Sequence, residues 1–352
     1  MERHFRRYIV KILILGVNGF IGSHLGERLL ADPQWEVTGF DLAGDYVARW
    51  AHHPRFTFRQ GDIFREDAWL AEAVAAADVV FPLAGVAKPA LYVKRPLYVY
   101  ELDYEQNVKI ARRCAEHGTR IIFPSTSEVY GMSPHRELKE DESPLVLGPI
   151  AASRWIYSCS KQMMDRVLAA LGQERGLRYS CFRPFNWMGP RLDTFEDAAR
   201  HEARAVTQML YDMIHGRPVV LVNGGAQRRS FTHVDDGIDG LLAILTQEER
   251  AQGQIFNLGN PDNNASIREL ALAVRDALKE HPAWRAVAEA AALEDRPAAA
   301  YYGPGYEDVE DRRPSVAKAR ELLGWAPRIN FAETVRRTVA SILETIPCPP
   351  SA

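Results

Sequence analysis

The spacing of a tyrosine and a lysine is the most chemically suggestive feature of the sequence. Tyr157 and Lys161 lie four residues apart in Tyr-Ser-Cys-Ser-Lys. On a helix, residues i and i+4 share a face, so the phenol and the ammonium would point the same way. A nearby ammonium favours the phenolate and lowers the pKa of the phenol. Such a tyrosine can act as the general base that takes the proton of an alcohol while hydride leaves the adjacent carbon.

A strand that runs into hydroxyl-bearing residues supports this interpretation, because Tyr-x-x-x-Lys alone also occurs as an ordinary helix-surface pair. The apolar run Arg120–Pro124 predicts a buried strand, and Ser125, Thr126 and Ser127 follow it directly. Open α/β sheets bind ligands at the carboxyl ends of their strands. Ser/Thr-rich turns are common without any function, so these hydroxyls gain meaning only together with the Tyr157 pattern.

A glycine-rich turn predicts a dinucleotide site. Gly16, Gly19 and Gly22 form G-x-x-G-x-x-G between an expected strand and an expected helix. Such glycines permit a tight turn and the close approach of a pyrophosphate, and the helix N-terminus attracts phosphate. Asp41 ends the second expected strand, where a carboxylate can accept both ribose hydroxyls, which favours NAD over NADP. A turn that needs glycine only for packing is the alternative.

The expected NAD contacts extend from this turn to the loops after the second and third strands and to the Tyr157 pair. Asp62 follows the third strand and could meet the adenine. The full set of expected cofactor residues is Gly16, Asn18, Gly19, Phe20, Ile21, Gly22, Asp41, Asp62, Ile63, Tyr157 and Lys161. No metal site is expected, because the 4 cysteines form no C-x-x-C pair.

Alternating strands and helices must position these residues. Strands are expected at residues 8–15, 35–42, 56–60, 78–82 and 120–124, and helices at 20–31, 68–77 and 101–118. This alternation indicates an α/β fold with a Rossmann-like doubly wound parallel sheet. Later helices, expected at 201–215, 236–246, 267–279, 315–323 and 331–343, are separated by Gly- and Pro-containing loops. They predict a smaller C-terminal α/β domain.

The expected domain division places residues 1–185 in an NAD-binding domain. Residues 186–346 would form mainly a substrate-binding domain, with some chain returning to the first, and residues 347–352 a frayed tail. The chain has 352 residues, 47% hydrophobic and 25% charged, which is ordinary for globular proteins.

Charge and hydropathy exclude several classes of partner. The net charge of −3 gives no basic excess for nonspecific nucleic-acid binding. No apolar stretch approaches the roughly 20 residues that cross a bilayer. The few scattered cysteines suit a reducing compartment. We therefore expect a cytoplasmic protein that binds neither nucleic acid nor membrane.

The glycine turn, Asp41, the hydroxyl cluster and Tyr-x-x-x-Lys together resemble the extended short-chain dehydrogenase/reductase superfamily, whose members act mostly on nucleotide sugars. Five segments narrow the resemblance to UDP-glucuronate decarboxylases, including the decarboxylase domain of bifunctional polymyxin-resistance enzymes and UDP-xylose synthases. These segments are residues 124–132, 154–158, 183–192, 224–232 and 301–315. The resemblance implies oxidation of C4 of UDP-glucuronate with NAD⁺ and loss of CO₂ through an enolate. The product would be UDP-4-ketopentose, which related enzymes reduce to UDP-xylose.

The resemblance implies a role for each matching residue. Tyr157 would be the base for the C4 hydroxyl, with its pKa tuned by Lys161. Glu128 would assist decarboxylation, and Arg312 would hold the carboxylate and help to protonate the enolate. Thr126 and Ser127 would hydrogen-bond the sugar and its carboxylate. The other expected substrate contacts are Ala87, Tyr92, Arg154, Asn186, Arg204, Arg229 and Tyr306, of which the arginines at 204 and 229 would meet the UDP diphosphate.

Two positions depart from the pattern of the polymyxin-resistance enzyme. Lys88 replaces a small polar residue, so its ammonium could strengthen or obstruct carboxylate binding. Val220 replaces a lysine near UDP and removes one cationic contact. Superfamily members usually dimerise through two long helices, here expected at Glu101–Gly118 and Tyr157–Gly172.

Two other functions fit the same residues. A UDP-sugar 4-epimerase needs only Tyr157, Lys161 and NAD. A dinucleotide-binding sensor or scaffold of the same fold is the non-enzymatic alternative, although such proteins usually lack the Tyr/Lys pair. Release of the ketone and its reduction to UDP-xylose are both compatible with these residues.

Overall fold

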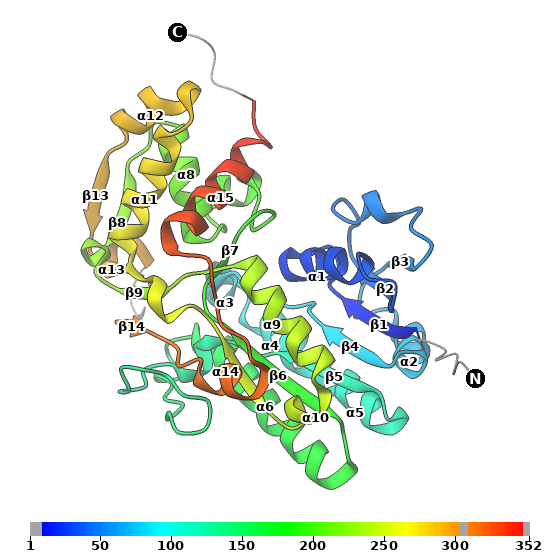
Figure 1. The fold of residues 1–352 in the computed structure, drawn as a ribbon. Helices are drawn as coiled ribbons and strands as arrows, with labels where there is room; N and C mark the ends of the chain where they lie inside the picture. Colours follow the sequence, from blue (N-terminus) through cyan, green and yellow to red (C-terminus); the bar gives the residue numbers. More distant parts are fainter. Residues whose placement is uncertain (1–8, 303–308, 348–352) are drawn as a thin grey trace.

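A seven-stranded parallel sheet forms the centre of the molecule (Figure 1), and the computed structural model describes residues 9–302 and 309–347. In spatial order the strands are β11 (Ile255–Leu258), β6 (Tyr179–Pro184), β5 (Arg120–Pro124), β4 (Val79–Pro82), β1 (Val10–Leu15), β2 (Trp35–Asp41) and β3 (Phe56–Gln60). All neighbours in this sheet pair in parallel. The order reverses on either side of β1, as in a doubly wound fold. The predicted fold class is therefore confirmed.

Helices cover both faces of this sheet because its strands are apolar on both sides. Along β1, Ile12 and Ile14 join one core and Leu13 and Leu15 the other, the alternation that extended backbone imposes. The first core includes side chains of α1 (Phe20–Leu30), α9 (Val234–Thr246) and α14 (Ala317–Leu323). The second includes side chains of α2 (Asp67–Ala76), α5 (Asn107–His117) and α6 (Trp155–Arg175).

The helix expected at residues 101–118 is not one regular α-helix. The structure has α4 (Pro96–Tyr100), a π-helical segment η2 (Glu101–Gln106) and then α5. The side-chain amide of Asn107 donates to the carbonyls of Leu102 and Asp103, at 3.1 and 3.2 Å. The wider turn carries Asp103 into the interior, where its side chain is fully buried. Such π-turns often occur at functional sites.

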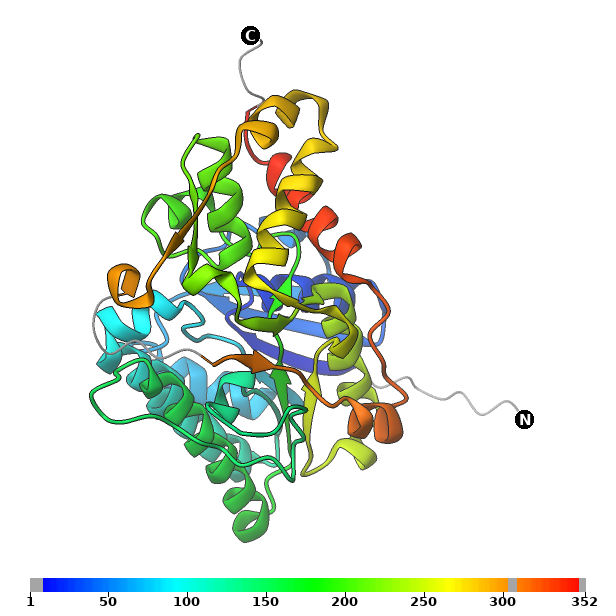
Figure 2. The same ribbon diagram turned by 90° about the vertical axis from the view of Figure 1, so that its left-hand side faces the viewer.

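A smaller group of elements from the C-terminal half packs beside the sheet around its own core (Figure 2). It contains α8 (Ala205–Ile214), α11 (Ile267–Lys279), α12 (Arg285–Ala290) and α15 (Phe331–Leu343), and β8 (Val219–Val222) pairs with β13 (Leu293–Arg296). A second small sheet has the order β12 (Asn264–Ser266), β9 (Arg228–Ser230) and β14 (Asp311–Arg312). Strand β14 brings Arg312 back to the carboxyl edge of the large sheet.

Three segments of the later sequence belong to the large sheet and its helix layers. Strand β11 extends the sheet beyond β6, and α9 and α14 contribute to the core that contains α1. In Figure 1 the yellow-green α9 lies beside the blue α1. None of the helices within 9–302 and 309–347 is long and apolar enough to span a membrane.

Candidate active site

Tyr157 and Lys161 lie on the first two turns of α6, which packs against the carboxyl end of β5. Both side chains are buried. Lys161 Nζ donates a hydrogen bond to the carbonyl of Pro124, the last residue of β5, at 3.0 Å. The same Nζ lies 5.8 Å from the centroid of the Tyr157 ring. The helix thus presents phenol and ammonium on one face, as the four-residue spacing predicts.

The hydroxyl cluster meets this pair directly. Thr126 caps the short helix η3 (Ser127–Tyr130) by accepting the backbone N–H of Glu128, at 3.2 Å, and its hydroxyl also bonds to the Tyr157 phenol. Ser127 is buried next to it. On the other side, the ring of Tyr92 stacks on that of Tyr157 with centroids 4.5 Å apart. The structure therefore brings Tyr92, Thr126, Ser127, Tyr157 and Lys161 together.

Burial governs the state of the phenol in this arrangement. It raises the pKa of Tyr157 well above the ordinary range, and the Asp103 carboxylate raises it further, while Thr126 lowers it by hydrogen bonding. The Tyr157 hydroxyl is therefore protonated at neutral pH unless a further positive charge binds beside it. The nicotinamide ring of NAD⁺ carries a positive charge that would act in the opposite direction.

An acidic residue held between two arginines adjoins this cluster. Glu128 Oε1 lies 2.8 Å from Arg312 and Oε2 lies 3.2 Å from Arg154. Burial alone would raise the pKa of Glu128, but the guanidinium groups of Arg312 and Arg154 outweigh it and hold the pKa at about 2. The group is a carboxylate at neutral pH. Arg312 Nε is buried without a hydrogen-bond partner among the described residues, so its N–H can donate a further hydrogen bond to an anion.

The glycine turn forms a cradle that only glycine permits. Gly16 has φ +87°, and a Cβ there would lie 2.5 Å from the backbone nitrogen of Ala84. A Cβ at Gly22 would collide with the carbonyl oxygen of Gly16. Gly19 caps α1 without a side chain, so the helix N-terminus is open to a phosphate. This cradle fits the pyrophosphate of a dinucleotide.

Asp41 stands at the end of β2 beside this cradle. Its carboxylate accepts the backbone N–H groups of Asn18 and Leu42, at 2.8 and 2.7 Å, and burial raises its pKa. Asn18 in turn accepts the N–H of Tyr46 at 2.8 Å. Asp62 follows β3 and accepts the N–H of Phe64 at 3.0 Å. The expected adenosine residues thus share the carboxyl edge of the sheet with Ile63, which is buried.

The remaining expected substrate residues are distributed around the same edge. Arg204 pairs with Asp193 at 2.8 Å and lies over the ring of Phe20, so its guanidinium is engaged rather than solvated. Arg229 is buried and donates to the carbonyl of Val309 at 2.8 Å. Asn186 has the unusual φ of +39°, a strained geometry that clusters at functional loops. Ala87 is exposed, and Tyr306 lies outside the described residues.

Lys88 is not a free ammonium. Its Nζ lies 2.8 Å from Asp197 on α7 (Phe195–Ala199), so the loop after β4 is joined to the C-terminal half. Val220 lies in the middle of β8 and pairs with Glu294. Neither departure disturbs the Tyr157 cluster.

One buried residue of the site was missed by the sequence analysis. Asp103 Oδ1 lies 3.0 Å from Lys161 Nζ, and Asp103 Oδ2 accepts the N–H of Val86 at 3.1 Å. In the sequence it stands between Glu101 and Glu105, which makes it look like part of a solvated acidic helix face. Only the π-turn, which the spacing does not reveal, turns it inwards.

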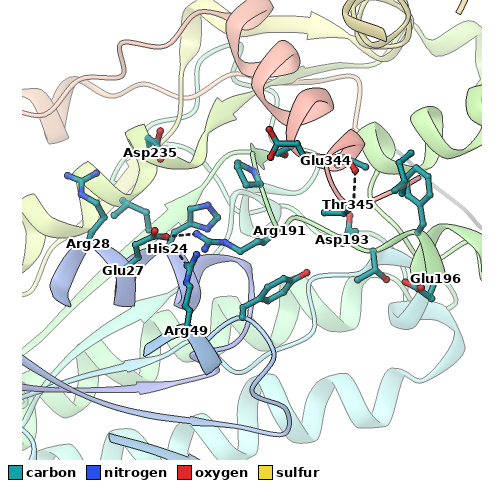
Figure 3. Close-up of a pocket in the computed structure, with 18 residues that line it drawn as sticks. His24, Glu27, Arg28, Arg49, Arg191, Asp193, Glu196, Asp235, Glu344 and Thr345 are labelled. Carbon is teal, nitrogen blue, oxygen red and sulfur yellow. Dashed lines mark hydrogen bonds and ion pairs between the residues drawn. The ribbon is translucent and has the colours of Figure 1, made fainter. Parts of the chain in front are cut away.

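A cavity of about 870 Å³ lies apart from this cluster, between α1, the segment 190–196 and α15. Figure 3 shows Arg49 and Arg191 converging on Glu27, each at 2.9 Å. Burial lowers the pKa of His24 in its wall to about 4. Neither Tyr157 nor Glu128 lines this cavity. Within the described ranges no group of three or more His, Cys, Asp or Glu is placed to hold a metal ion.

Comparisons with known proteins agree with this geometry. The NAD dependent epimerase/dehydratase family matches residues 12–259. The crystal structure of the PbgP3 protein from Burkholderia pseudomallei is 41% identical, with a TM-score of 0.85, covering 94% of this chain and 96% of that chain.

More distant structures share the fold. UDP-glucuronic acid 4-epimerase from Bacillus cereus, solved with UDP-glucuronic acid and NAD, is 22% identical with a TM-score of 0.78, covering 96% of this chain and 100% of that one. UDP-glucose 4-epimerase from Thermotoga maritima, solved with UDP-glucose, is 22% identical with a TM-score of 0.76, covering 96% and 99%. At these identities the likeness shows the fold alone.

The family match spans well over half of the chain and coincides with the sheet, the glycine cradle and the Tyr157 cluster. Its cofactor is NAD, as the carboxylate of Asp41 predicts. The likeness to the Burkholderia protein extends over nearly the whole length of both chains. The chain therefore belongs to the NAD dependent epimerase/dehydratase family.

Proposed function

We propose that this protein is a UDP-glucuronate decarboxylase, which oxidises C4 of UDP-glucuronate with NAD⁺ and releases CO₂ from C5. The observation that carries the proposal is the ion pair between Glu128 and Arg312, which lies beside the Tyr157 phenol. A 4-epimerase of a neutral UDP-sugar needs the tyrosine and lysine only. A guanidinium and a carboxylate next to them suit a substrate that itself bears a carboxylate.

The first step uses the Tyr157 cluster. Tyr157 takes the proton of the C4 hydroxyl. It acts as a base in its phenolate form, which the ammonium of Lys161 stabilises. Thr126 hydrogen-bonds the same phenol oxygen and keeps it directed at the sugar. NAD⁺, when bound in the glycine cradle, supplies the chemistry of hydride acceptance from C4. The stacked ring of Tyr92 excludes water from the phenol.

The second step uses the arginines around Glu128. The C4 ketone lies β to the C5 carboxylate, so the C5–carboxyl bond can break with its electron pair passing into an enolate. Arg312 holds the substrate carboxylate through a charge-assisted hydrogen bond. Glu128 is ionised, so its role is to orient Arg312 and Arg154. Because arginine does not normally lose its proton, Arg312 directs a water that protonates C5.

The C-terminal half binds the nucleotide in this proposal. Arg229 and Arg204 approach the carboxyl edge of the sheet and carry the fork geometry that suits diphosphate oxygens. Arg204 must then exchange part of its contact with Asp193 for the phosphate. Asn186 and Arg154 contact the sugar from the two sides of the cluster.

In the deciding experiment the purified protein is mixed with UDP-glucuronate and NAD⁺. NMR identifies the sugar products, and the absorbance of NADH is followed in parallel. NADH with UDP-4-ketopentose identifies a decarboxylase that releases the ketone. UDP-xylose without net NADH identifies one that reduces it again. Formation of UDP-galacturonate without CO₂ would identify a 4-epimerase instead of a decarboxylase. An unchanged substrate would contradict the proposal.

We also propose a homodimer through the helices around α6. Exposed apolar side chains lie on its neighbours and on α6 itself: Val93 on α3 (Pro89–Lys94), Leu97 on α4 and Met163 on α6, with exposed fractions of 54%, 71% and 46%. Helix α4 packs against α6. A second copy would cover these side chains and remove them from water.

A further inference from the structure

Asp103 is a fully buried carboxylate with an ionic partner in the catalytic pair. Its Oδ1 lies 3.0 Å from Lys161 Nζ, and both side chains are almost completely enclosed. A buried charge is costly unless it is paired. The second oxygen, Oδ2, accepts the N–H of Val86 at 3.1 Å. Both carboxylate oxygens thus contact groups of the site.

The backbone on both sides is shaped to admit this carboxylate. The π-turn of η2 points Asp103 inwards, and Asn107 closes that turn through two carbonyl contacts. Opposite it, a Cβ at Gly85 would lie 2.7 Å from Asp103 Oδ1 and 3.9 Å from Lys161 Nζ. Only glycine therefore leaves room for Asp103 to reach the lysine.

The lysine is held between two acceptors. Lys161 Nζ contacts the Pro124 carbonyl from the end of β5 and the Asp103 carboxylate from η2, each at 3.0 Å. These contacts fix where the ammonium lies relative to the phenol. The carboxylate also offsets the positive charge that Lys161 presents to Tyr157.

We propose that Asp103 is a positioning residue for the reaction, which fixes Lys161 and keeps the Tyr157 phenol protonated until a cationic cofactor ring lies beside it. This inference rests on the role of Tyr157 under the proposed function. The inference about Asp103 goes beyond the proposed function, because a Tyr/Lys pair without Asp103 would release the phenol proton more readily. Asp103, Lys161 and Tyr157 then act as a triad.

Other polar and charged groups surround the Tyr157 phenol besides Asp103 and Lys161. Thr126 and Glu128 approach from the segment after β5, Tyr92 from α3, and Arg154 from the residue before α6. Burial has the largest effect on the pKa of Tyr157, and Asp103 has the next largest, followed by Thr126 and Glu128. Removing the charge at Asp103 therefore removes the strongest electrostatic opposition to the phenolate.

The test replaces Asp103→Asn, which keeps the shape and removes the charge. We expect the acid limb of the pH profile for NADH formation to move to lower pH by about one unit or more, because the phenolate forms more readily. The matched control is Asp165→Asn. Asp165 is also buried, on the helix α6 that carries Tyr157, but it pairs with Arg183 at 2.8 Å, so its replacement should not move the limb. An unchanged limb in Asp103→Asn would overturn the proposal.

A measurement without substrate separates this inference from the proposed function. Tyrosine labelled with ¹³C at Cζ reports phenol ionisation by NMR in the NAD⁺ complex, and the signal is assigned with Tyr157→Phe. We expect Tyr157 to begin titrating about one pH unit lower in Asp103→Asn than in the native chain. Equal titration in the two proteins would refute the triad even if CO₂ is released, and a shift would support it even if the substrate proves different.

A second variant keeps the test decisive if Asp103→Asn does not fold. The double replacement Asp103→Asn with Lys161→Met leaves no unpaired buried charge, whereas Lys161→Met alone leaves the carboxylate uncompensated. Tyr157 should titrate at lower pH in the double variant than in Lys161→Met. Identical titration in both would show that Asp103 does not act on the phenol.

Discussion

At the scale of single residues, the phenol of Tyr157 is the group on which the proposed oxidation depends. Tyr157→Phe keeps the ring that stacks on Tyr92 at 4.5 Å, so the fold should be unchanged. We expect the rate of NADH formation with UDP-glucuronate to fall by at least about 100-fold, the size of a typical general-base contribution. Stopped-flow absorbance measures it, with NAD⁺ affinity by calorimetry as the control. Turnover within a factor of three of the native rate would contradict the assignment.

Arg312 offers a sharper test of decarboxylation, because an exposed arginine stands next to it. Arg312→Met removes the buried guanidinium that contacts Glu128 at 2.8 Å. Arg313→Met removes the same group from an exposed position. We expect Arg312→Met to slow CO₂ release by at least about tenfold, with a smaller change in UDP affinity. Arg313→Met should change neither, and equal losses in the two variants would speak against the proposed contact.

The carboxylate of Glu128 predicts a pH dependence of stability. Its pKa is about 2 in the folded chain and 4.5 in the reference state. A lowered folded pKa means that its contribution to stability is fully present above pH 4.5 and is lost as the pH falls toward 2. Denaturant unfolding should therefore show that the native chain exceeds Glu128→Gln in free energy of unfolding by less at pH 3 than at pH 6. A constant difference between the two proteins would show that Glu128 is not held ionised.

At the scale of elements, the junction of β1 and α1 determines cofactor binding. Gly22→Ala should force α1 away from the Gly16 carbonyl and weaken NAD⁺ binding by at least about tenfold, with a stability loss of about 1–3 kcal/mol from overpacking. Gly176→Ala, at the left-handed C-cap of α6, meets no atom within 4 Å. It should cost about 1 kcal/mol of stability and leave NAD⁺ affinity unchanged. Calorimetry and thermal unfolding distinguish the two effects.

The first five strands could be predicted from sequence because each is a short apolar run between turn residues. Positions within them agree closely: the expected strand 56–60 is β3, and 120–124 is β5. Strands β6 and β11 were not predicted, because residues 179–184 and 255–258 mix polar with apolar side chains. Their place at the β11 end of the sheet is decided by tertiary pairing rather than by local pattern.

The candidate site likewise contains local features that the sequence reveals and long-range contacts that it does not. The Gly16 turn and the Tyr157 pair depend on spacing along one segment, and spacing is visible in the sequence. The contacts of Lys88 with Asp197 and of Lys161 with Asp103 join segments that are far apart in the chain, at 2.8 and 3.0 Å. Long-range pairing of this kind leaves no local pattern, which is why Lys88 was considered only in relation to the substrate carboxylate and Asp103 was overlooked.

At the scale of the whole molecule, Lys88 joins the loop after β4 to α7 across the two halves. Its ammonium is already paired with Asp197, at 2.8 Å and 30% side-chain exposure. We expect Lys88→Met to change the KM for UDP-glucuronate by less than about threefold and the free energy of unfolding by less than about 1 kcal/mol, as for partly exposed ion pairs. Steady-state kinetics and denaturant unfolding check this. A KM increase above tenfold would show that Lys88 binds the substrate carboxylate instead.

The proposed dimer predicts a specific loss of assembly. Leu97→Asp with Met163→Asp places charges on the exposed apolar side chains around α6 and should convert a dimer to a monomer in light scattering. Ile150→Asp is the matched control, because Ile150 is fully exposed in a loop outside α4 and α6. It should leave the mass unchanged. A monomeric native chain, or loss of assembly in Ile150→Asp, would refute this interface.

The late position of β11 in the chain has a consequence for synthesis on the ribosome. Strand β6 ends at Pro184, but its outer neighbour β11 is complete only at Leu258. At about 5–20 residues per second, the backbone groups along the outer edge of β6 stay without their strand for roughly 4–15 s. An unpaired edge of this kind can join strands of other chains. The nascent chain should therefore need chaperone protection during that interval, before the sheet under the Tyr157 helix is complete.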